Sequence, residues 1–144
     1  MAKKRETVDT GPLLTSLQRL GWFRKINDTV QIGIPDIIGC FDGTTFGIEV
    51  KSIKEVPEGG IVPPSSAHTF SAKQVHDLQG IWNAGGVGVG LVICGKVAAI
   101  FTPDQIDKNG QVNWMEARAY INKEKGEWIL ADLLWMRKTS QDRS

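Results

Sequence analysis

The chain has 144 residues, 41% hydrophobic and 23% charged, with a formal net charge of +1. These values are typical of a folded globular protein with one domain, and they exclude two domains of ordinary size. No apolar run reaches the roughly 18 residues that cross a membrane. The nearly neutral charge excludes a protein that coats DNA electrostatically, although it leaves a local basic patch open.

The first half of the chain is predicted to hold one helix and three strands. Pro12 suits the first turn of a helix, leucines follow it at helical spacing, and Gly21 suits the helix end. Asp42-Gly43 is the strongest short signal for a β-hairpin, and apolar runs flank it. The predicted elements are a helix over residues 12–20 and strands over residues 22–26, 34–41 and 44–52.

The second half begins with an irregular segment over residues 53–70, which holds three prolines and two glycines. Long irregular segments in small domains are more often functional or mobile than merely connecting. A helix is expected from Ser71 to Ala84, followed by strands over residues 87–95 and 96–101 and helices near residues 113–124 and 127–137. The order of elements indicates an α/β sandwich with a mixed sheet. We expect a flexible segment over residues 1–11, one domain over residues 12–137, and a polar tail over residues 138–144.

Three charged residues stand in the apolar hairpin, at Asp36, Glu49 and Lys51. If Asp42 and Gly43 are the two central residues of the turn, Asp36 lies opposite Glu49 on the neighbouring strand. Lys51 then points to the same side as Glu49, while the other side is apolar. A plain hairpin with a surface ion pair is the alternative, and a one-residue bulge would change the pairing.

Opposed carboxylates repel unless a positive charge lies between them, and a hard divalent cation suits oxygen ligands. We therefore expect Asp36, Glu49 and the backbone carbonyl of Val50 to bind Mg²⁺ or Mn²⁺. Such a cation can acidify a water molecule and polarise a phosphate oxygen. Lys51 would stabilise charge on the phosphate or orient the attacking water. This set of residues indicates phosphodiester hydrolysis.

Pro35-Asp36 and Glu49-Val50-Lys51, with Ser71-x-x-Gln74 after them, resemble the motifs of a known nuclease family. The chain is similar over about residues 12–101 to the virus-type replication-repair nuclease (VRR-NUC) domain of the PD-(D/E)XK superfamily. The resemblance implies a restriction-endonuclease-like αβββαβ core, with a central mixed sheet flanked by helices. It also implies metal-dependent DNA cleavage, which such domains carry out in phages and in proteins of replication, repair or recombination. Small members resemble Holliday-junction resolvases and often form homodimers.

The resemblance extends the expected site. It adds Gln74 to the catalytic residues and Lys54, Ser71 and Lys73 to those that bind substrate. The Ser71-x-x-Gln74 spacing is equally typical of a helix capping box. The alternative for Lys73 is a solvated lysine without a role in binding. The expected location is the cytoplasm, or the host cytoplasm if the protein is viral, because the first residues lack the apolar segment of a secretory signal.

The chain departs from the family at the first helix, where many relatives carry a further acidic residue. Residues 12–23 contain no acid, and Gln18 is their only amide-bearing residue besides the backbone. Either Glu6 or Asp9 folds back toward the site, or water takes that position. The number of metal ions per site, one or two, therefore stays open.

The remaining candidates have plainer interpretations. His68 and His76 are expected to be solvated and not to bind zinc. The glycines at residues 85–90 are expected to end a helix and to allow close packing of the backbone. Cys40 and Cys94 are expected to be buried thiols, with a disulfide as the lesser alternative. Tryptophans near the C-terminus are expected either in the core or in a dimer interface; they are Trp114, Trp128 and Trp135.

Two function classes follow. The first is a metal-dependent DNA endonuclease that is selective for branched or junction DNA. The second is a catalytically silent nucleic-acid-binding or assembly module on the same fold. The intact Asp36, Glu49 and Lys51 favour the first, because a silent module has no need of opposed carboxylates.

Overall fold

The computed structural model describes residues 5–26, 35–62 and 69–142, with side chains described for residues 10–26, 35–62 and 69–139. Its centre is a six-stranded sheet in the order β1-β2-β3-β5-β6-β8, and β4 pairs with β7 beside it. The strands are β1 (Trp22–Lys25), β2 (Ile37–Phe41), β3 (Thr44–Ile53), β4 (Ile61–Val62), β5 (Val87–Cys94), β6 (Val97–Phe101), β7 (Val112–Asn113) and β8 (Ala119–Asn122). The helices are α1 (Arg5–Gln18), α2 (Ala72–Asn83) and α3 (Gly126–Asp142), with short 3₁₀ turns η2 (Pro103–Gln105) and η3 (Trp114–Glu116). The expected mixed α/β architecture is confirmed.

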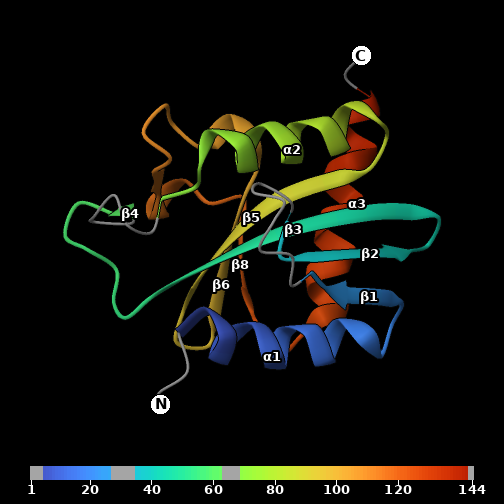
Figure 1. Cartoon of the computed structure of the whole chain (residues 1–144), viewed down its shortest axis with the longest axis horizontal. Helices are drawn as coiled ribbons and strands as arrows, with labels where there is room; N and C mark the ends of the chain where they lie inside the picture. The colour runs from blue at the N-terminus through green and yellow to red at the C-terminus, as the bar shows by residue number, and fades with distance from the viewer. Residues whose placement is uncertain (1–4, 27–34, 63–68, 143–144) are drawn as a thin grey trace.

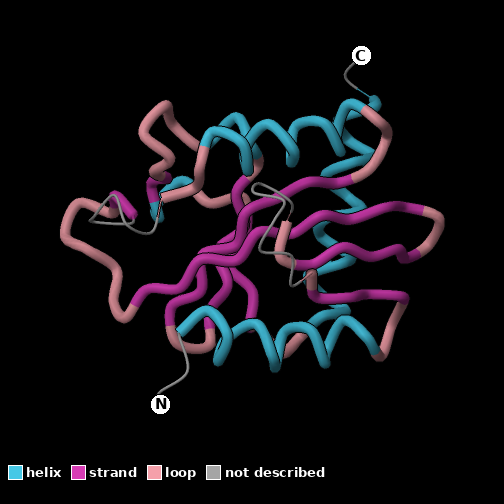
Figure 2. The backbone as a smooth tube through the Cα atoms, in the orientation of Figure 1, coloured by secondary structure: helices cyan, strands magenta, loops and turns pink. Residues whose placement is uncertain are grey.

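The sheet is mixed because one of its neighbouring pairs is parallel. β3 and β5 run parallel, and the other neighbours in the sheet are antiparallel. A parallel pair needs a crossover connection, and here the segment from β4 through α2 supplies it. Figure 1 shows α2 along one side of the sheet and α1 along the other, and the backbone trace in Figure 2 shows the strands between them.

Alternating side chains of β3 divide the core into two clusters, one on each face of the sheet. The larger cluster joins α1 and α3 to β3, with Leu13, Leu17, Phe46, Ile48, Val50, Ile129 and Leu133 among its members. The smaller cluster joins α2 and the segment before it to the opposite face, with Phe70, Leu78, Val92 and Phe101 among its members. Glu49 and Lys51 alternate with Ile48 and Val50, so they project toward the face covered by α2.

Glycines let α2 approach the sheet closely. A Cβ atom on Gly88 would collide with the backbone of Leu78, and one on Gly47 would collide with the Ile81 side chain. The indole N–H of Trp82 donates to the Gly88 carbonyl at 2.6 Å. The role expected for the glycines at residues 85–90 is confirmed at Gly88, which packs closely, and at Gly85, which ends the helix with a left-handed φ of 99°.

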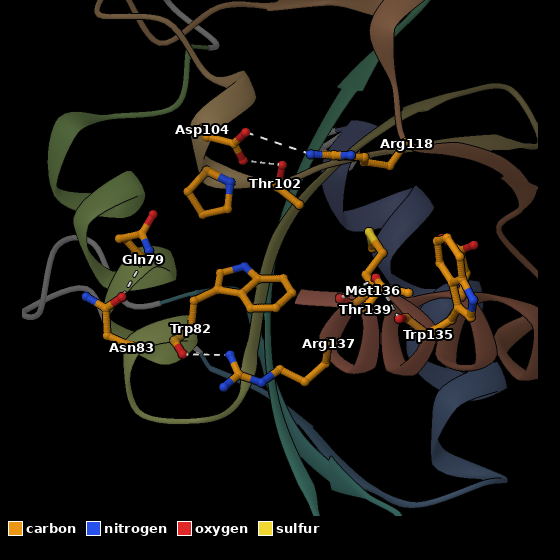
Figure 3. Close-up of a pocket in the computed structure, with 12 residues that line it drawn as sticks. Gln79, Trp82, Asn83, Thr102, Asp104, Arg118, Trp135, Met136, Arg137 and Thr139 are labelled. Atoms are coloured by element: carbon orange, nitrogen blue, oxygen red, sulfur yellow. Dashed lines mark hydrogen bonds and ion pairs between the residues drawn. The ribbon is translucent and has the colours of Figure 1, made fainter. Parts of the chain in front are cut away.

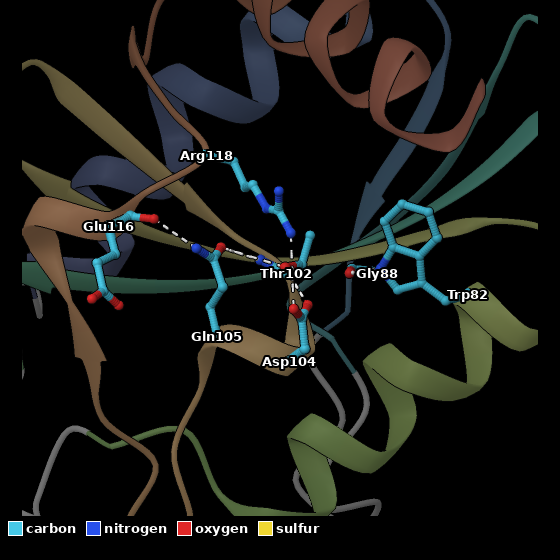
Figure 4. A network of polar contacts seen from close by, with 7 residues as sticks. All are labelled: Trp82, Gly88, Thr102, Asp104, Gln105, Glu116 and Arg118. Atoms are coloured by element: carbon cyan, nitrogen blue, oxygen red, sulfur yellow. Dashed lines mark hydrogen bonds and ion pairs between the residues drawn. The ribbon is translucent and has the colours of Figure 1, made fainter. Parts of the chain in front are cut away.

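The prediction of a helix near residues 113–124 is wrong. This segment contains β7, η3 and β8, and β8 pairs with β6 from Val97↔Asn122 to Ile100↔Ala119. The Gln105 side chain donates to the Glu116 carbonyl at 2.6 Å, and Arg118 forms an ion pair with Asp104 at 3.8 Å (Figure 4). These contacts and the open edge of β6 favour an extended chain over local helix propensity.

Two helices extend beyond their expected bounds. α1 begins at Arg5 and includes Pro12, whereas Pro12 was expected in the first turn. α3 continues to Asp142, through most of the segment expected to be a polar tail. The division into a flexible start, one domain and a tail stays a prediction. No helix in the described part of the chain is long and apolar enough to span a membrane.

The cysteines and tryptophans differ in part from expectation. Cys40 is exposed and Cys94 is partly buried, and neither forms a disulfide, so the expectation of two buried thiols is wrong for Cys40. Trp128 and Trp135 are 60% and 63% exposed, which excludes them from the core of this chain. The core side of α3 is instead formed by Ile129, Leu130, Leu133 and Met136.

Candidate active site

The β2–β3 hairpin brings Asp36 and Glu49 together. Its strands pair from Ile37↔Ile48 to Phe41↔Thr44, so one further step in the same register places Asp36 opposite Glu49. Asp42 and Gly43 have φ values of 52° and 73°, as the central residues of a tight type I′ turn require. The expected register is confirmed, and no bulge interrupts the paired residues.

Asp36 is held in place directly before the first residue of β2. Its Oδ2 atom accepts a hydrogen bond from the Val50 N–H at 2.9 Å, and its carbonyl accepts from the Ile26 N–H at 2.8 Å. The Asp36 side chain thus extends the hydrogen-bond ladder between β2 and β3 by one bond beyond the first residue of β2. Because the N–H and C=O of one strand residue point to the same edge, the Val50 carbonyl is also directed to the side where Asp36 lies.

Glu49 is a buried carboxyl group, with 2% of its surface exposed. Its Oε2 atom is buried and has no hydrogen-bond partner among the described residues. Burial, followed by the negative charge of Asp36 and a hydrogen bond with it, raises the pKa of Glu49 to about 9; the charge of Lys51 lowers it. Without a cation, the pair therefore retains a proton at neutral pH.

Lys51 lies on the same face, two residues after Glu49. Its ammonium nitrogen is 5.6 Å from the ring centroid of Phe70, which is 2% exposed. The site therefore combines two carboxyl groups, one cationic side chain and an aromatic ring. Phe70 is not among the site residues expected from the sequence, although its position directly before the N-cap Ser71 was a signal for it.

The donor set fits a hard divalent cation. Asp36 and Glu49 provide carboxylate oxygens, Glu49 Oε2 is without a partner in the described structure, and the Val50 carbonyl points to the same edge of β3 as its bonded N–H. Oxygen donors of this kind suit Mg²⁺ or Mn²⁺ better than softer metals. Among the described residues, no group of three or more His, Cys, Asp or Glu side chains is arranged to hold a metal.

Comparison with solved structures identifies the architecture. The chain is similar to the 1.6 Å structure of Hjc from Archaeoglobus fulgidus, a Holliday junction resolvase from an archaeal hyperthermophile. The TM-score is 0.58 at 18% sequence identity, over 83% of this chain and 92% of the resolvase. The fold is restriction-endonuclease-like. No protein-family model and no curated protein matches the sequence, so the narrower resemblance to VRR-NUC domains stays a prediction.

In this restriction-endonuclease-like fold, Ser71 and Gln74 form the expected capping box of α2. Ser71 Oγ accepts from the Gln74 N–H at 3.0 Å, and Gln74 Oε1 accepts from the Ser71 N–H at 2.8 Å. Capping is confirmed, and their roles in catalysis and substrate binding stay predictions. Lys54 and Lys73 are exposed, as a substrate-binding or a solvated lysine would be.

The first helix leaves the question of a third acid open. Glu6 and Asp9 both lie within α1, and their side chains are outside the described residues. Gln18 donates from its side-chain amide to the Phe23 carbonyl at 3.2 Å, which engages it at the end of α1. His76 is exposed, and His68 lies outside the described residues.

A separate pocket of about 550 Å³ lies between α2, η2 and α3, away from the residues of the candidate site. Trp82 and Arg137 lie side by side in it, with the guanidinium carbon 5.4 Å from the ring centroid, and Met136 faces them from α3 (Figure 3). Asp36, Glu49 and Lys51 do not line this pocket. The candidate active site therefore lies on a face of the sheet, outside this pocket.

Proposed function

We propose that the protein is a DNA endonuclease that depends on Mg²⁺ or Mn²⁺. One observation carries the proposal: Glu49 is buried against Asp36, keeps an oxygen without a partner in the described structure, and has Lys51 on the same face. Burying two adjacent carboxyl groups is costly unless a proton or a cation lies between them. A silent binding module has no need for this arrangement.

Each residue has a distinct role in the proposed reaction. Asp36, Glu49 and the Val50 carbonyl would hold the cation, which when bound supplies Lewis-acid polarisation of a phosphate oxygen and a more acidic water. Asp36 is already oriented by its hydrogen bond from Val50. Lys51 donates hydrogen bonds to the phosphate oxygens as negative charge develops on them, or orients the attacking water. Gln74 is the further catalytic residue that the family resemblance adds.

We further propose that the substrate is branched DNA and that the protein acts as a homodimer in replication, repair or recombination. The likeness in fold to a Holliday junction resolvase supports the substrate class. The exposed Trp128 and Trp135 on α3 support an interface between two copies. A two-fold dimer would present two sites for paired cuts. The cytoplasmic location stays a prediction.

The decisive experiment compares cleavage of a labelled four-way junction with cleavage of the matched linear duplex, in Mg²⁺, in Mn²⁺ and in EDTA. We expect junction cleavage that EDTA abolishes and that Asp36→Ala, Glu49→Ala and Lys51→Ala each remove. Lys108→Ala, a change to an exposed lysine far from Lys51 in the sequence, serves as a control for overall charge. A protein that binds the junction and cuts neither substrate in either metal is the silent module instead. Light scattering at micromolar concentration tests the homodimer.

A further inference from the structure

The contact between Phe70 and Lys51 extends the proposed site beyond its charged residues. The Lys51 ammonium lies 5.6 Å from the Phe70 ring centroid, within the range at which a cation is attracted to an aromatic face. Phe70 is 2% exposed, so the ring is shielded from water that would weaken this attraction. Lys51 is only partly buried, and its long side chain has few other constraints among the described contacts.

The space for the Phe70 ring is created by a glycine beside Glu49. Gly90 pairs with Glu49 in the parallel register of β3 and β5. A Cβ atom on Gly90 would lie 2.7 Å from both Cε1 and Cζ of Phe70. The ring therefore occupies the space that a side chain at position 90 would fill. Lys51, the next residue of β3 on the same face as Glu49, reaches over the ring.

The backbone of Phe70 is held from a second direction. Its N–H donates to the Gly110 carbonyl at 2.9 Å, and a Cβ atom on Gly110 would collide with the Phe70 carbonyl. The turn that contains Gly110 is closed by Asp107, whose Oδ1 accepts from the N–H groups of Asn109 and Gln111 at 2.9 Å each. The residue after Phe70 is Ser71, the N-cap of α2. The ring is thus fixed by the sheet, a distant turn and a helix start.

We propose that Phe70 is a positioning residue that holds the Lys51 ammonium over the carboxyl pair. This inference rests on the proposed endonuclease function. Restricting a flexible lysine before the substrate binds reduces the entropy lost when its ammonium engages the phosphate. Removing the ring should therefore slow the chemical step, by roughly three- to thirty-fold for a cation–π contact of ordinary strength, and leave the KM for DNA unchanged.

The test replaces Phe70 in the 144-residue chain by phenylalanines carrying one, two or three fluorine atoms. Fluorine withdraws electron density from the ring face while nearly preserving its shape, so packing is retained and the attraction to the ammonium falls. Single-turnover cleavage of the labelled junction should slow with each fluorine at constant KM. Phe70→Leu should cut more slowly still. Phe46→Leu removes a buried ring from the opposite face of β3, and its folded fraction should cut at the wild-type rate. Equal rates across the fluorine series would overturn the inference.

A second measurement separates this inference from the proposed function. The ring current of Phe70 should shift the NMR signals of the Lys51 ε-methylene group in protein labelled at lysine Cε, with Lys51→Arg giving the assignment. Phe70→Leu should remove the shift, and Phe46→Leu should keep it. If the shift is present but the wild-type protein cuts no DNA, the proposed function fails while the ring–ammonium contact stands. If the protein cuts DNA and Lys51 shows no shift, the positioning role fails alone.

Discussion

Replacing Glu49 by Gln should change the pH dependence of stability in the metal-free protein. The pKa of Glu49 is raised from 4.5 to about 9, first by burial and then by Asp36. The folded protein therefore keeps a proton on Glu49 that the unfolded chain releases above pH 4.5. Since the folded state binds more protons, its stability relative to the unfolded state must fall as pH rises, until the pH passes the folded pKa.

The size of the effect follows from one proton. Between the two pKa values, the free energy of unfolding should fall by about 1.4 kcal/mol per pH unit, hence by about 4 kcal/mol from pH 5 to pH 8. This is a large fraction of the roughly 5–15 kcal/mol that stabilises a typical domain. Glu49→Gln keeps the shape and cannot ionise, so its stability should lack this contribution.

Urea unfolding in EDTA, followed by tryptophan fluorescence at pH 5, 6, 7 and 8, measures the difference between wild type and Glu49→Gln. Other titrating groups contribute to both proteins and cancel in that difference. Glu127→Gln, which changes an exposed acid on α3, should track the wild type. If wild type and Glu49→Gln lose stability in parallel over this range, Glu49 does not retain a proton in the folded state and the reasoning is refuted.

Three further changes test separate parts of the molecule. Mn²⁺ at a hundredfold excess over its Kd should stabilise the wild type by about 2.7 kcal/mol and leave Glu49→Gln unaffected in thermal melts; equal shifts would place the cation elsewhere. Ser71→Ala should lower the free energy of unfolding by about 1 kcal/mol through loss of the α2 cap, and unchanged cleavage by the folded fraction would restrict Ser71 to capping. Gly88→Ala should destabilise by about 1–3 kcal/mol in urea because its methyl group meets the Leu78 backbone, whereas Gly80→Ala, with open space around it, should not destabilise.

The hairpin and the helix cap were predictable because local chemistry determines them. Asp42-Gly43 adopts the left-handed conformations that a two-residue turn needs, and the turn fixes the register out to Asp36 and Glu49. The Ser71-x-x-Gln74 spacing closes its hydrogen bonds within a single turn. The relative positions of the two carboxyl groups could therefore be inferred from the sequence alone.

Contacts between distant segments were not predictable in the same way. β8 is extended because Ala119 pairs with Ile100 of β6, which lies outside any local window. The Phe70 ring lies beside Glu49 only because Gly90, forty-one positions later than Glu49, leaves room for it. For Trp128 and Trp135 the sequence left core and interface open. The buried residues of α3 recur on the opposite side of that helix, and this periodicity would have placed both tryptophans outside the core.

The parallel pairing of β3 with β5 has a consequence for the order in which this protein folds. Asp36 and Glu49 meet through a two-residue turn, whereas Gly90 reaches Glu49 only after the long crossover has closed. Hairpins form within about 1–10 μs, and connections between distant segments take longer. The Glu49 carboxyl group should thus first face Asp36 in water, where Glu49 is ionised at neutral pH. Glu49 then takes up its proton when β5 and Phe70 dock, so alkaline conditions should slow that late step of refolding.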